Sequence, residues 1–506
     1  MNRTKKTAIN AFVNLVSILL TSIASFFMVR VVLEKMGSDY NGLNQTVTQL
    51  IAILTIFEGS FTSASLIALY EPYGTNKADN VNLICSTAKR AFFISGVVLL
   101  VGGVVFAVVF SSFIKTAYAY ITIVLIFLIS LASTIHSSMF SLKYRILFQV
   151  TQTEYILNVI STVGNLLSHA AAYFYLRNND NIIYLRVIYA IFPITINGVI
   201  CLVGKKRFSN VSFDMPADFS KIRGTKDLMI GSMTGSIYKS TPFLFISSFA
   251  GTIYTSVYAV YSSIYNIVDS ISYSLFSAPK NGIGQMIAEK DQGNINRVFK
   301  EFELLCLLII STLLASVGGV IMPFIKIYTK GITDVNYSDY MIAYLILASI
   351  FVQYMHMPSG LFINMAGHFK AVKNIQLVSA AALVTFDIIG AISFGIYGIL
   401  TANLLTGILL AFLEIRYARK MIVQLNNYSL AKLIAVFIGS TILLIYIYNV
   451  LFSSYVTNYL QFLYIGILIF IISSAVFIIV SYIFFNSDTK ALFTRFRNIV
   501  IGRKNR

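Results

Sequence analysis

Ionisable side chains near the middle of long apolar stretches are rare in proteins, and this sequence has Glu58, Lys239, Asp269 and Asp387 in such places. A charge at the centre of a membrane is costly, so it usually faces a water-filled cavity or a partner charge. We therefore expect these groups to line a polar cleft. The alternative is a structural ion pair of Lys239 with Asp269 or Glu58. The three carboxylates are candidate ion-coupling sites for H⁺ or Na⁺.

Hydroxyl and amide side chains recur every three to four residues along several apolar stretches, which places them on one helix face. Hydrogen bonding between membrane helices is the alternative to cavity lining for such residues. Arg30, one turn from the end of the first stretch, either faces the cavity or extends to the lipid headgroups. With Lys239 and Arg30, the candidate substrate cavity comprises Asn14, Thr21, Thr55, Ser236, Asn266 and Tyr273.

Composition identifies the solvent of this chain as lipid. Apolar residues make up 57% and charged residues 11% of the 506 residues, and the mean hydropathy is +0.78. Soluble domains average about 45–50% apolar and about 25% charged residues. The net charge of +18 comes from basic residues in short loops between apolar runs, which excludes a nucleic-acid-binding face. Three scattered cysteines without C-x-x-C spacing predict neither disulfides nor a metal site.

Apolar runs bounded by charge, Gly, Pro or Asn predict an all-α polytopic membrane protein with about 14 transmembrane helices. The run between 374 and 417 is divided only by a short segment around Gly395. The predicted crossings are 8–33, 43–70, 88–114, 118–141, 153–176, 182–204, 226–249, 255–279, 300–325, 338–366, 374–394, 396–417, 430–452 and 457–485.

The distribution of basic residues predicts the orientation. Roughly 30 of the 38 Lys and Arg residues fall on the side that holds both termini, so we expect both termini in the cytoplasm of a bacterial plasma membrane. The residues assigned to the opposite side are Arg30, Lys35, Lys115, Arg177, Arg186, Lys326 and Lys330.

Two six-helix halves around a central cleft, followed by two extra C-terminal helices, are the expected arrangement. A basic, polar linker at 205–225 separates the halves, and Gly37-x-x-Tyr40 in the first turn resembles Gly251-x-x-Tyr254 in the second half. Transporters built from repeats bind substrate where the repeats meet. The predicted domains are 1–204, the linker 205–225, 226–420, and the tail region 421–506.

The first hairpin, Val29 to Lys77, also carries a family resemblance. Its turn reads LEKMGSDYNGLNQ, its second helix contains Glu58-Gly59, and it ends with SLIALYEP. This order resembles Wzx-type oligosaccharide flippases of the multidrug/oligosaccharidyl-lipid/polysaccharide exporter superfamily. The residues Asn41, Gln45 and Phe61 depart from the family pattern.

The resemblance implies transport of an undecaprenyl-diphosphate-linked oligosaccharide repeat unit from the inner to the outer leaflet by alternating access, for capsule or exopolysaccharide synthesis. The implied partners are this lipid-linked substrate, membrane lipids, a polysaccharide polymerase and glycosyltransferases. A cation such as Lys239 would neutralise the diphosphate. No cofactor is implied.

Other functions remain open from the sequence. A cation-coupled multidrug exporter of the same superfamily would have a more apolar cleft, and a peptidoglycan-precursor flippase would need more cavity arginines. A membrane-bound glycosyl transferase or polymerase would need a large outer loop, and the outer loops here are short. The sequence lacks Walker A, H-E-x-x-H and G-x-S-x-G motifs, so we expect a protein that is not an enzyme.

Overall fold

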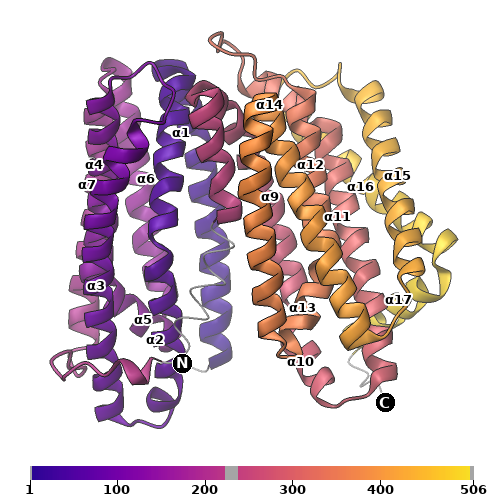
Figure 1. Ribbon diagram of the computed structural model, residues 1–506, viewed down its shortest axis with the longest axis horizontal. Helices are drawn as coiled ribbons and strands as arrows, with labels where there is room; N and C mark the ends of the chain where they lie inside the picture. Colours follow the sequence, from indigo (N-terminus) through magenta and orange to yellow (C-terminus); the bar gives the residue numbers. More distant parts are fainter. Residues whose placement is uncertain (1–2, 223–236, 502–506) are drawn as a thin grey trace. The chain divides into compact units, whose positions relative to one another are not determined.

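The computed structural model describes residues 3–222 and 237–501, and every regular element within these ranges is a helix (Figure 1). The predicted all-α class is confirmed, and the chain is a polytopic membrane protein. Nine helical stretches of the described residues are long and apolar enough to cross a membrane. Two of them, Ile9–Leu54 and Phe369–Val423, are each long enough for two of the predicted crossings.

The chain forms two compact units, Met1–Ser256 and Val257–Arg506. In the first unit, α1 packs on α6, α6 on α7, and α3 on both α2 and α4. Its elements are α1 (Arg3–Leu54), α2 (Ile56–Gly74), α3 (Ala78–Ser111), α4 (Tyr120–His136), the π-helix η1 (Ser137–Ser141), α5 (Leu142–Val150), α6 (Glu154–Asn178), α7 (Ile182–Arg207), the 3₁₀ turn η2 (Phe219–Lys221), a helix over 237–245, and the π-helix η3 (Ile246–Ala250).

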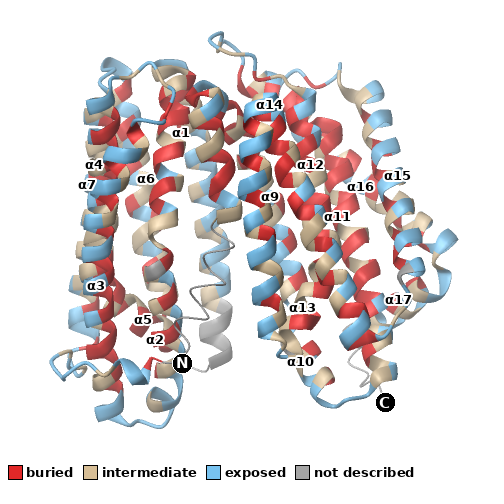
Figure 2. Cartoon of the chain, viewed as in Figure 1, coloured by how far each residue is buried: buried red, intermediate tan, exposed pale blue. Residues whose placement is uncertain are grey.

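The second unit is built around α11, which packs against α12, α15 and α16. Figure 2 shows most of α11 buried. The elements are α9 (Thr252–Ser277, whose first residues belong to the first unit), α10 (Lys280–Ala288), α11 (Gln292–Tyr328), α12 (Tyr340–Met355), α13 (Met357–Met365), α14 (Phe369–Ala418), the π-helix η4 (Arg419–Val423), α15 (Asn427–Phe452), α16 (Tyr459–Phe484) and α17 (Asn486–Ile501).

Glycines with positive φ form three of the breaks between successive crossings. Gly37 (φ 78°) bends α1, Gly251 (φ 104°) separates η3 from α9, and Gly395 (φ 57°) bends α14. Side chains disfavour these backbone conformations, whereas glycine adopts them readily. Gly37 and Gly251 also share an extended ψ, 174° and 161°. The two positions that the sequence pairs as corresponding turns therefore have similar backbones, although the division into the predicted domains stays a prediction.

The described part of the predicted linker, residues 205–222, is bonded to other elements of the first unit. Its residues Phe208–Ile222 lie against the N-terminal turns of α3, and Phe208 and Ile222 are buried at its two ends. The Lys143 ammonium lies 5.3 Å from the ring centroid of Phe213. The linker residues bonded to α3 are Ser212 (with Asn82), Asp214 (with Lys89), Met215 (with Ser86) and Asp218 (with Thr87).

The two arms of α14 meet at a pair of glycines. A Cβ at Gly390 would lie 2.5 Å from the carbonyl oxygen of Gly398, and a Cβ at Gly398 would lie 1.9 Å from that of Gly390. Backbone therefore contacts backbone where the arms cross, because neither residue has a side chain. This close approach makes the sharp bend at Gly395 a helical hairpin, as the sequence predicts.

Replacing Gly398 with alanine is expected to destabilise the protein, because the new Cβ overlaps the Gly390 carbonyl. Overpacking of this kind costs about 1–3 kcal/mol. Gly439→Ala in α15 is the matched control, since nothing lies within 4 Å of its Cβ and alanine favours a helix interior. Thermal unfolding of both purified variants in one detergent should give a lowered midpoint for Gly398→Ala alone; equal midpoints would contradict the close approach.

Candidate functional site

The turn that begins at Gly37 is bonded to two other connections of the first unit. The Asp39 carboxylate accepts hydrogen bonds from the Thr116 hydroxyl and the Ala117 N–H, each at 2.9 Å. It also accepts one from the Thr252 hydroxyl. Thr116 and Ala117 precede α4, whereas Thr252 begins α9. A single carboxylate therefore joins three connections between helices.

Two further residues of this turn pack against the start of α9. A Cβ at Gly42 would lie 1.7 Å from the Thr252 carbonyl oxygen, so a glycine is required there. The side-chain amide of Asn41 donates to the Ser256 hydroxyl at 2.7 Å, and both side chains are buried. Together with Asp39, these residues give the turn that carries the family resemblance a packing role.

Arg186 is a cation inside the first unit, although its position near the start of an apolar run predicts a boundary residue. It lies on α7 and donates to the Asn44 side-chain oxygen and to the Ser130 hydroxyl. Tyr40 and Tyr189 interact with its guanidinium electrostatically. Residues from α1, α4 and α7 thus form one polar layer, which we call the Arg186 layer: Tyr40, Asn44, Ser130, Arg186 and Tyr189.

Glu58 belongs to a second polar layer of the same unit. Its Oε2 atom is buried and has no hydrogen-bond partner among the described residues. Ser138 in η1 and the Arg145 guanidinium on α5 interact with this carboxylate. Arg145 donates to Asn197 Oδ1 at 3.1 Å, and the Ser141 hydroxyl donates to the same oxygen at 2.9 Å. We call these five residues the Glu58 layer; they come from α2, η1, α5 and α7.

Sequence reasoning missed Arg145 because the predicted crossing ends at residue 141. In the structure the π-helix η1 continues directly into α5, which extends the helix to Val150. π-helical turns frequently occur at functional sites. The signal that could have found Arg145 is the apolar run that follows it, Ile146 to Phe148, in which every residue is fully buried.

Asp269 in the second unit is hydrogen-bonded by α12. Its Oδ1 atom accepts from Gln353 Nε2 at 2.9 Å and from the Tyr354 hydroxyl at 2.6 Å. The side-chain oxygen of Gln353, Oε1, in turn accepts from the Tyr265 hydroxyl at 2.5 Å. This network fixes the carboxylate with neutral donors, so Asp269 is held within its own unit.

Asp387 is fully buried on the first arm of α14, and neither carboxylate oxygen has a hydrogen-bond partner in the described part of the chain. Tyr258 on α9 is a neighbour that interacts with it electrostatically. Burying an ionised carboxylate without a partner costs so much that such a group normally takes up a proton or holds a cation. The surroundings of Asp387 therefore favour its neutral form.

The sequence does not predict two buried side-chain pairs of the second unit. Glu303 binds Arg419 through two hydrogen bonds of 2.6 and 2.8 Å, with side-chain exposures of 5% and 2%. His356 Nδ1 lies 2.8 Å from Glu414 Oε2. A Cβ at Gly360 would lie 2.6 Å from that oxygen, so this glycine makes room for the pair. Each pair joins helices that are distant in sequence, which local patterns do not reveal.

The predicted cavity residues of the first unit have mostly local partners. Arg30 forms an ion pair with Glu34 of its own helix at 2.8 Å and is 24% exposed. Thr21 donates to the Ser17 carbonyl and Thr55 to the Ala52 carbonyl. These three side chains therefore have partners a few residues away in the chain, and their contacts do not indicate a bound ligand.

Four other predicted cavity residues are exposed on their own units: Asn14, Lys239, Asn266 and Tyr273. Asn14 lies 3.5 Å from the side-chain amide of Asn158 on α6. The predicted residue Ser236 lies outside the described residues. Polar groups exposed at membrane depth are expected to face water or another polar surface rather than lipid.

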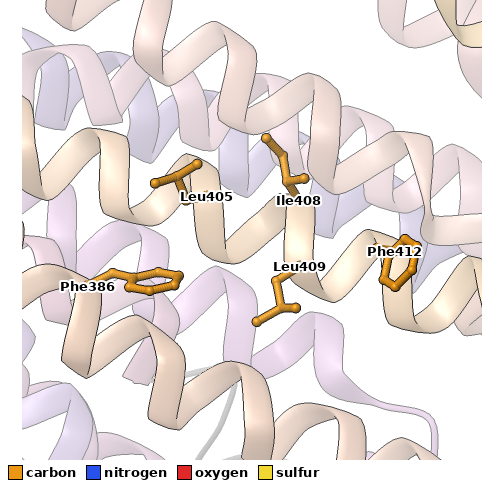
Figure 3. A pocket seen from close by; sticks show the side chains of 5 residues that line it. All are labelled: Phe386, Leu405, Ile408, Leu409 and Phe412. Atoms are coloured by element: carbon orange, nitrogen blue, oxygen red, sulfur yellow. The ribbon is translucent and has the colours of Figure 1, made fainter.

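An apolar groove lies between the arms of α14 (Figure 3), with a volume of about 370 Å³. It is lined by Phe386, Leu405, Ile408, Leu409 and Phe412. Because all of its lining side chains are hydrocarbon, it suits a lipid chain and offers nothing to a sugar or a phosphate. The polar layers, not this groove, are the candidate site for polar chemistry.

Comparison with known proteins identifies the fold. No protein-family model and no curated protein sequence match the chain. A lipid II flippase, MurJ, in an inward closed conformation is similar with a TM-score of 0.68, 15% identity, and coverage of 94% of this chain and 99% of the flippase. An inward-facing multidrug resistance MATE family transporter of the MOP superfamily has a TM-score of 0.67 and 12% identity, and the match covers 81% of this chain and 94% of the transporter. A MOP superfamily transporter from Pyrococcus furiosus has a TM-score of 0.59 and 12% identity, and the match covers 83% of this chain and 96% of that transporter.

These likenesses at low identity concern the fold. The chain has the fold of this flippase and of these two transporters.

The contrast between Asp387 and Glu303 predicts a small loss of stability when one charge is removed and a large loss when the other is removed. Asp387→Asn should change the free energy of unfolding by no more than about 1 kcal/mol, because no partner is lost. Glu303→Gln should cost about 3–5 kcal/mol, because Arg419 stays buried without its counter-charge. Chemical unfolding of both purified variants measures the difference. A large loss for Asp387→Asn would mean that a charged partner is present.

Proposed function

We propose that this protein is a transporter that flips an undecaprenyl-diphosphate-linked oligosaccharide repeat unit from the inner to the outer leaflet by alternating access. The observation that carries the proposal is the pair of guanidinium groups, Arg145 and Arg186, inside the membrane-spanning helices of the first unit. Both interact with hydroxyl and amide groups, and neither forms an ion pair within 4 Å in the described part of the chain, although Glu58 interacts electrostatically with Arg145.

The physical task explains why such groups are useful. A diphosphate and a sugar must pass about 30 Å of hydrocarbon, and an uncompensated anion there is prohibitively costly. Arginine binds phosphate oxygens through paired N–H donors, and such charge-assisted hydrogen bonds are roughly twice as strong as neutral ones. Asparagine, serine and tyrosine side chains beside the cations supply donors and acceptors for sugar hydroxyls.

The exposed polar residues complete the proposed substrate path. Within the first unit, Lys239 would approach the diphosphate, while Asn14 would contact sugar. For the second unit, Asn266 and Tyr273 stay predictions from the sequence. The lipid tail would remain in the bilayer throughout. In the proposed orientation both termini are cytoplasmic, so substrate is loaded on the side that carries most of the basic residues.

Ion coupling is the proposed role of Glu58, Asp269 and Asp387. Asp387 is the strongest of the three, because its carboxylate is fully buried and without a hydrogen-bond partner in the described structure. Binding of H⁺ or Na⁺ removes the cost of such a charge and can therefore be linked to a change of conformation. Glu58 can serve similarly through its unpartnered Oε2 atom. Asp269 already has neutral donors, so it is the weakest of the three.

A peptidoglycan-precursor flippase is the second candidate function. The sequence alone offered too few cavity arginines for it, but Arg145 and Arg186 lie inside the unit. The similarity to the lipid II flippase extends over 94% of this chain. A cation-coupled multidrug exporter is less well supported, because internal cations disfavour cationic drugs.

The test of the proposal is flipping in proteoliposomes that contain the purified protein and an undecaprenyl-diphosphate-linked oligosaccharide. A membrane-impermeant sugar oxidant reports which leaflet holds the substrate. Wild type should equilibrate the leaflets, and Arg145→Gln should slow flipping about tenfold or more, because charge-assisted hydrogen bonds to phosphate are lost. Lys205→Gln, an exposed change at the end of α7, is the matched control and should flip like wild type.

Substituting lipid II for the oligosaccharide carrier in the same assay separates the two candidate functions. Transport of lipid II alone would replace the first proposal by the second. Transport of neither, in folded protein with and without an ion gradient, would refute both. Intact flipping by Lys239→Ala would remove that lysine from the substrate path while leaving the arginine layers in place.

A further inference from the structure

The C-terminal helix α17 has two different faces: one packs on the second unit, and the other carries exposed basic residues. Leu492 is buried, and α17 packs on α11 and α16. Arg495 Nε binds Glu301 Oε2 of α11 at 2.7 Å. Lys490 and Arg497 are exposed. At 100° per residue, these two lie within about 20° of each other and on the side of the helix opposite Arg495.

Aromatic contacts locate this outer face at the membrane boundary. α17 begins two residues after α16 ends, and α16 is long enough to cross the hydrocarbon (Figure 1). Tyr482, in the last turn of α16, stacks on Phe493 of α17 with ring centroids 5.8 Å apart. Tyrosine at the end of a membrane helix is typical of the headgroup region. Phe493 therefore lies at headgroup depth, and it is 38% exposed.

A third exposed cation lies at the same boundary. The Lys432 ammonium, near the start of α15, is 5.6 Å from the ring centroid of Phe485, the residue that connects α16 to α17. The sequence continues beyond α17 with Arg503, Lys504 and Arg506. Among the described residues, Lys432 thus adds basic charge where α15 begins and α16 ends.

We propose that Lys432, Lys490, Phe493 and Arg497 form a binding surface for anionic phospholipid headgroups. The cations would bind the lipid phosphates, and the exposed Phe493 ring would enter the boundary between headgroups and acyl chains. An exposed phenylalanine beside basic residues is the composition of helices that lie in the membrane interface. The Arg495–Glu301 ion pair keeps the other face of α17 on α11, so the basic face is presented outward.

The proposal goes beyond transport and does not depend on which substrate is flipped. It also does not depend on which side of the cell membrane holds the C-terminus, because purified protein in detergent presents α17 to any added lipid. Failure of the flipping assay and failure of the lipid-binding assay are therefore separate results.

The test titrates short-chain phosphatidylglycerol into the full-length protein in a neutral detergent, with native mass spectrometry as the readout. Phosphatidylcholine of the same chain length is the probe without net charge. Wild type should bind phosphatidylglycerol more tightly than phosphatidylcholine. The double change Lys490→Gln/Arg497→Gln should weaken phosphatidylglycerol binding about thirtyfold, since each basic residue near an anionic lipid surface contributes roughly fivefold.

The matched control is Lys205→Gln/Lys206→Gln, which removes two exposed lysines at the end of α7 in the other unit. This control should stay within about twofold of wild type. An equal loss in the control pair would mean that only overall charge matters, and it would overturn the proposal. Equal binding of the two lipids by wild type would overturn it as well.

Hydrogen exchange of wild type provides a second measurement that needs no substitution. The amides of α17 should exchange more slowly in nanodiscs that contain phosphatidylglycerol than in nanodiscs of phosphatidylcholine alone. The amides of α10, a short helix of the same unit, should exchange equally in both. Identical exchange of α17 in the two lipids would contradict a headgroup-binding surface.

Discussion

The cost of placing a charge in hydrocarbon is the constraint on which this structure depends. Every ionisable group in a membrane helix must find a counter-charge, a set of neutral donors, or a proton or cation. Glu303 has the first solution in Arg419, and Asp269 has the second in Tyr354 and Gln353. Asp387 has neither within the described residues, which is why it differs chemically from the other buried acids.

Glycine residues permit the backbone geometry that the connections between crossings require. Hairpins between crossings need tight turns and close helix contacts, and Gly37, Gly251 and Gly395 supply the positive φ angles. Gly42 supplies the close contact of the first turn with α9. The Asp39 carboxylate then satisfies donors from two other connections. The turn that carries the family resemblance is thus held by contacts within its own unit.

The helices could be predicted because hydropathy and glycine act locally along the chain. The bend at Gly395 and the crossings around it follow from the sequence for that reason. The partners of the charges could not be predicted, since Glu303 and Arg419 are 116 residues apart and meet only after packing. Arg145 was missed for a different reason. The π-helix η1 contains a polar segment, Ser137–Ser141, and in the sequence this segment resembles the end of a membrane helix.

The two arginines inside the first unit differ from the Glu303–Arg419 pair in their capacity to bind another ion. The Glu303–Arg419 pair neutralises itself, so it has little capacity for another ion. Arg186 instead binds the neutral oxygens of Asn44 and Ser130. Arg145 binds the Asn197 oxygen and interacts electrostatically with Glu58, so neither arginine has the bidentate carboxylate contact that neutralises Arg419. A retained charge attracts an anion strongly in surroundings of low dielectric constant. For this reason we place the proposed diphosphate site in the first unit rather than in the second.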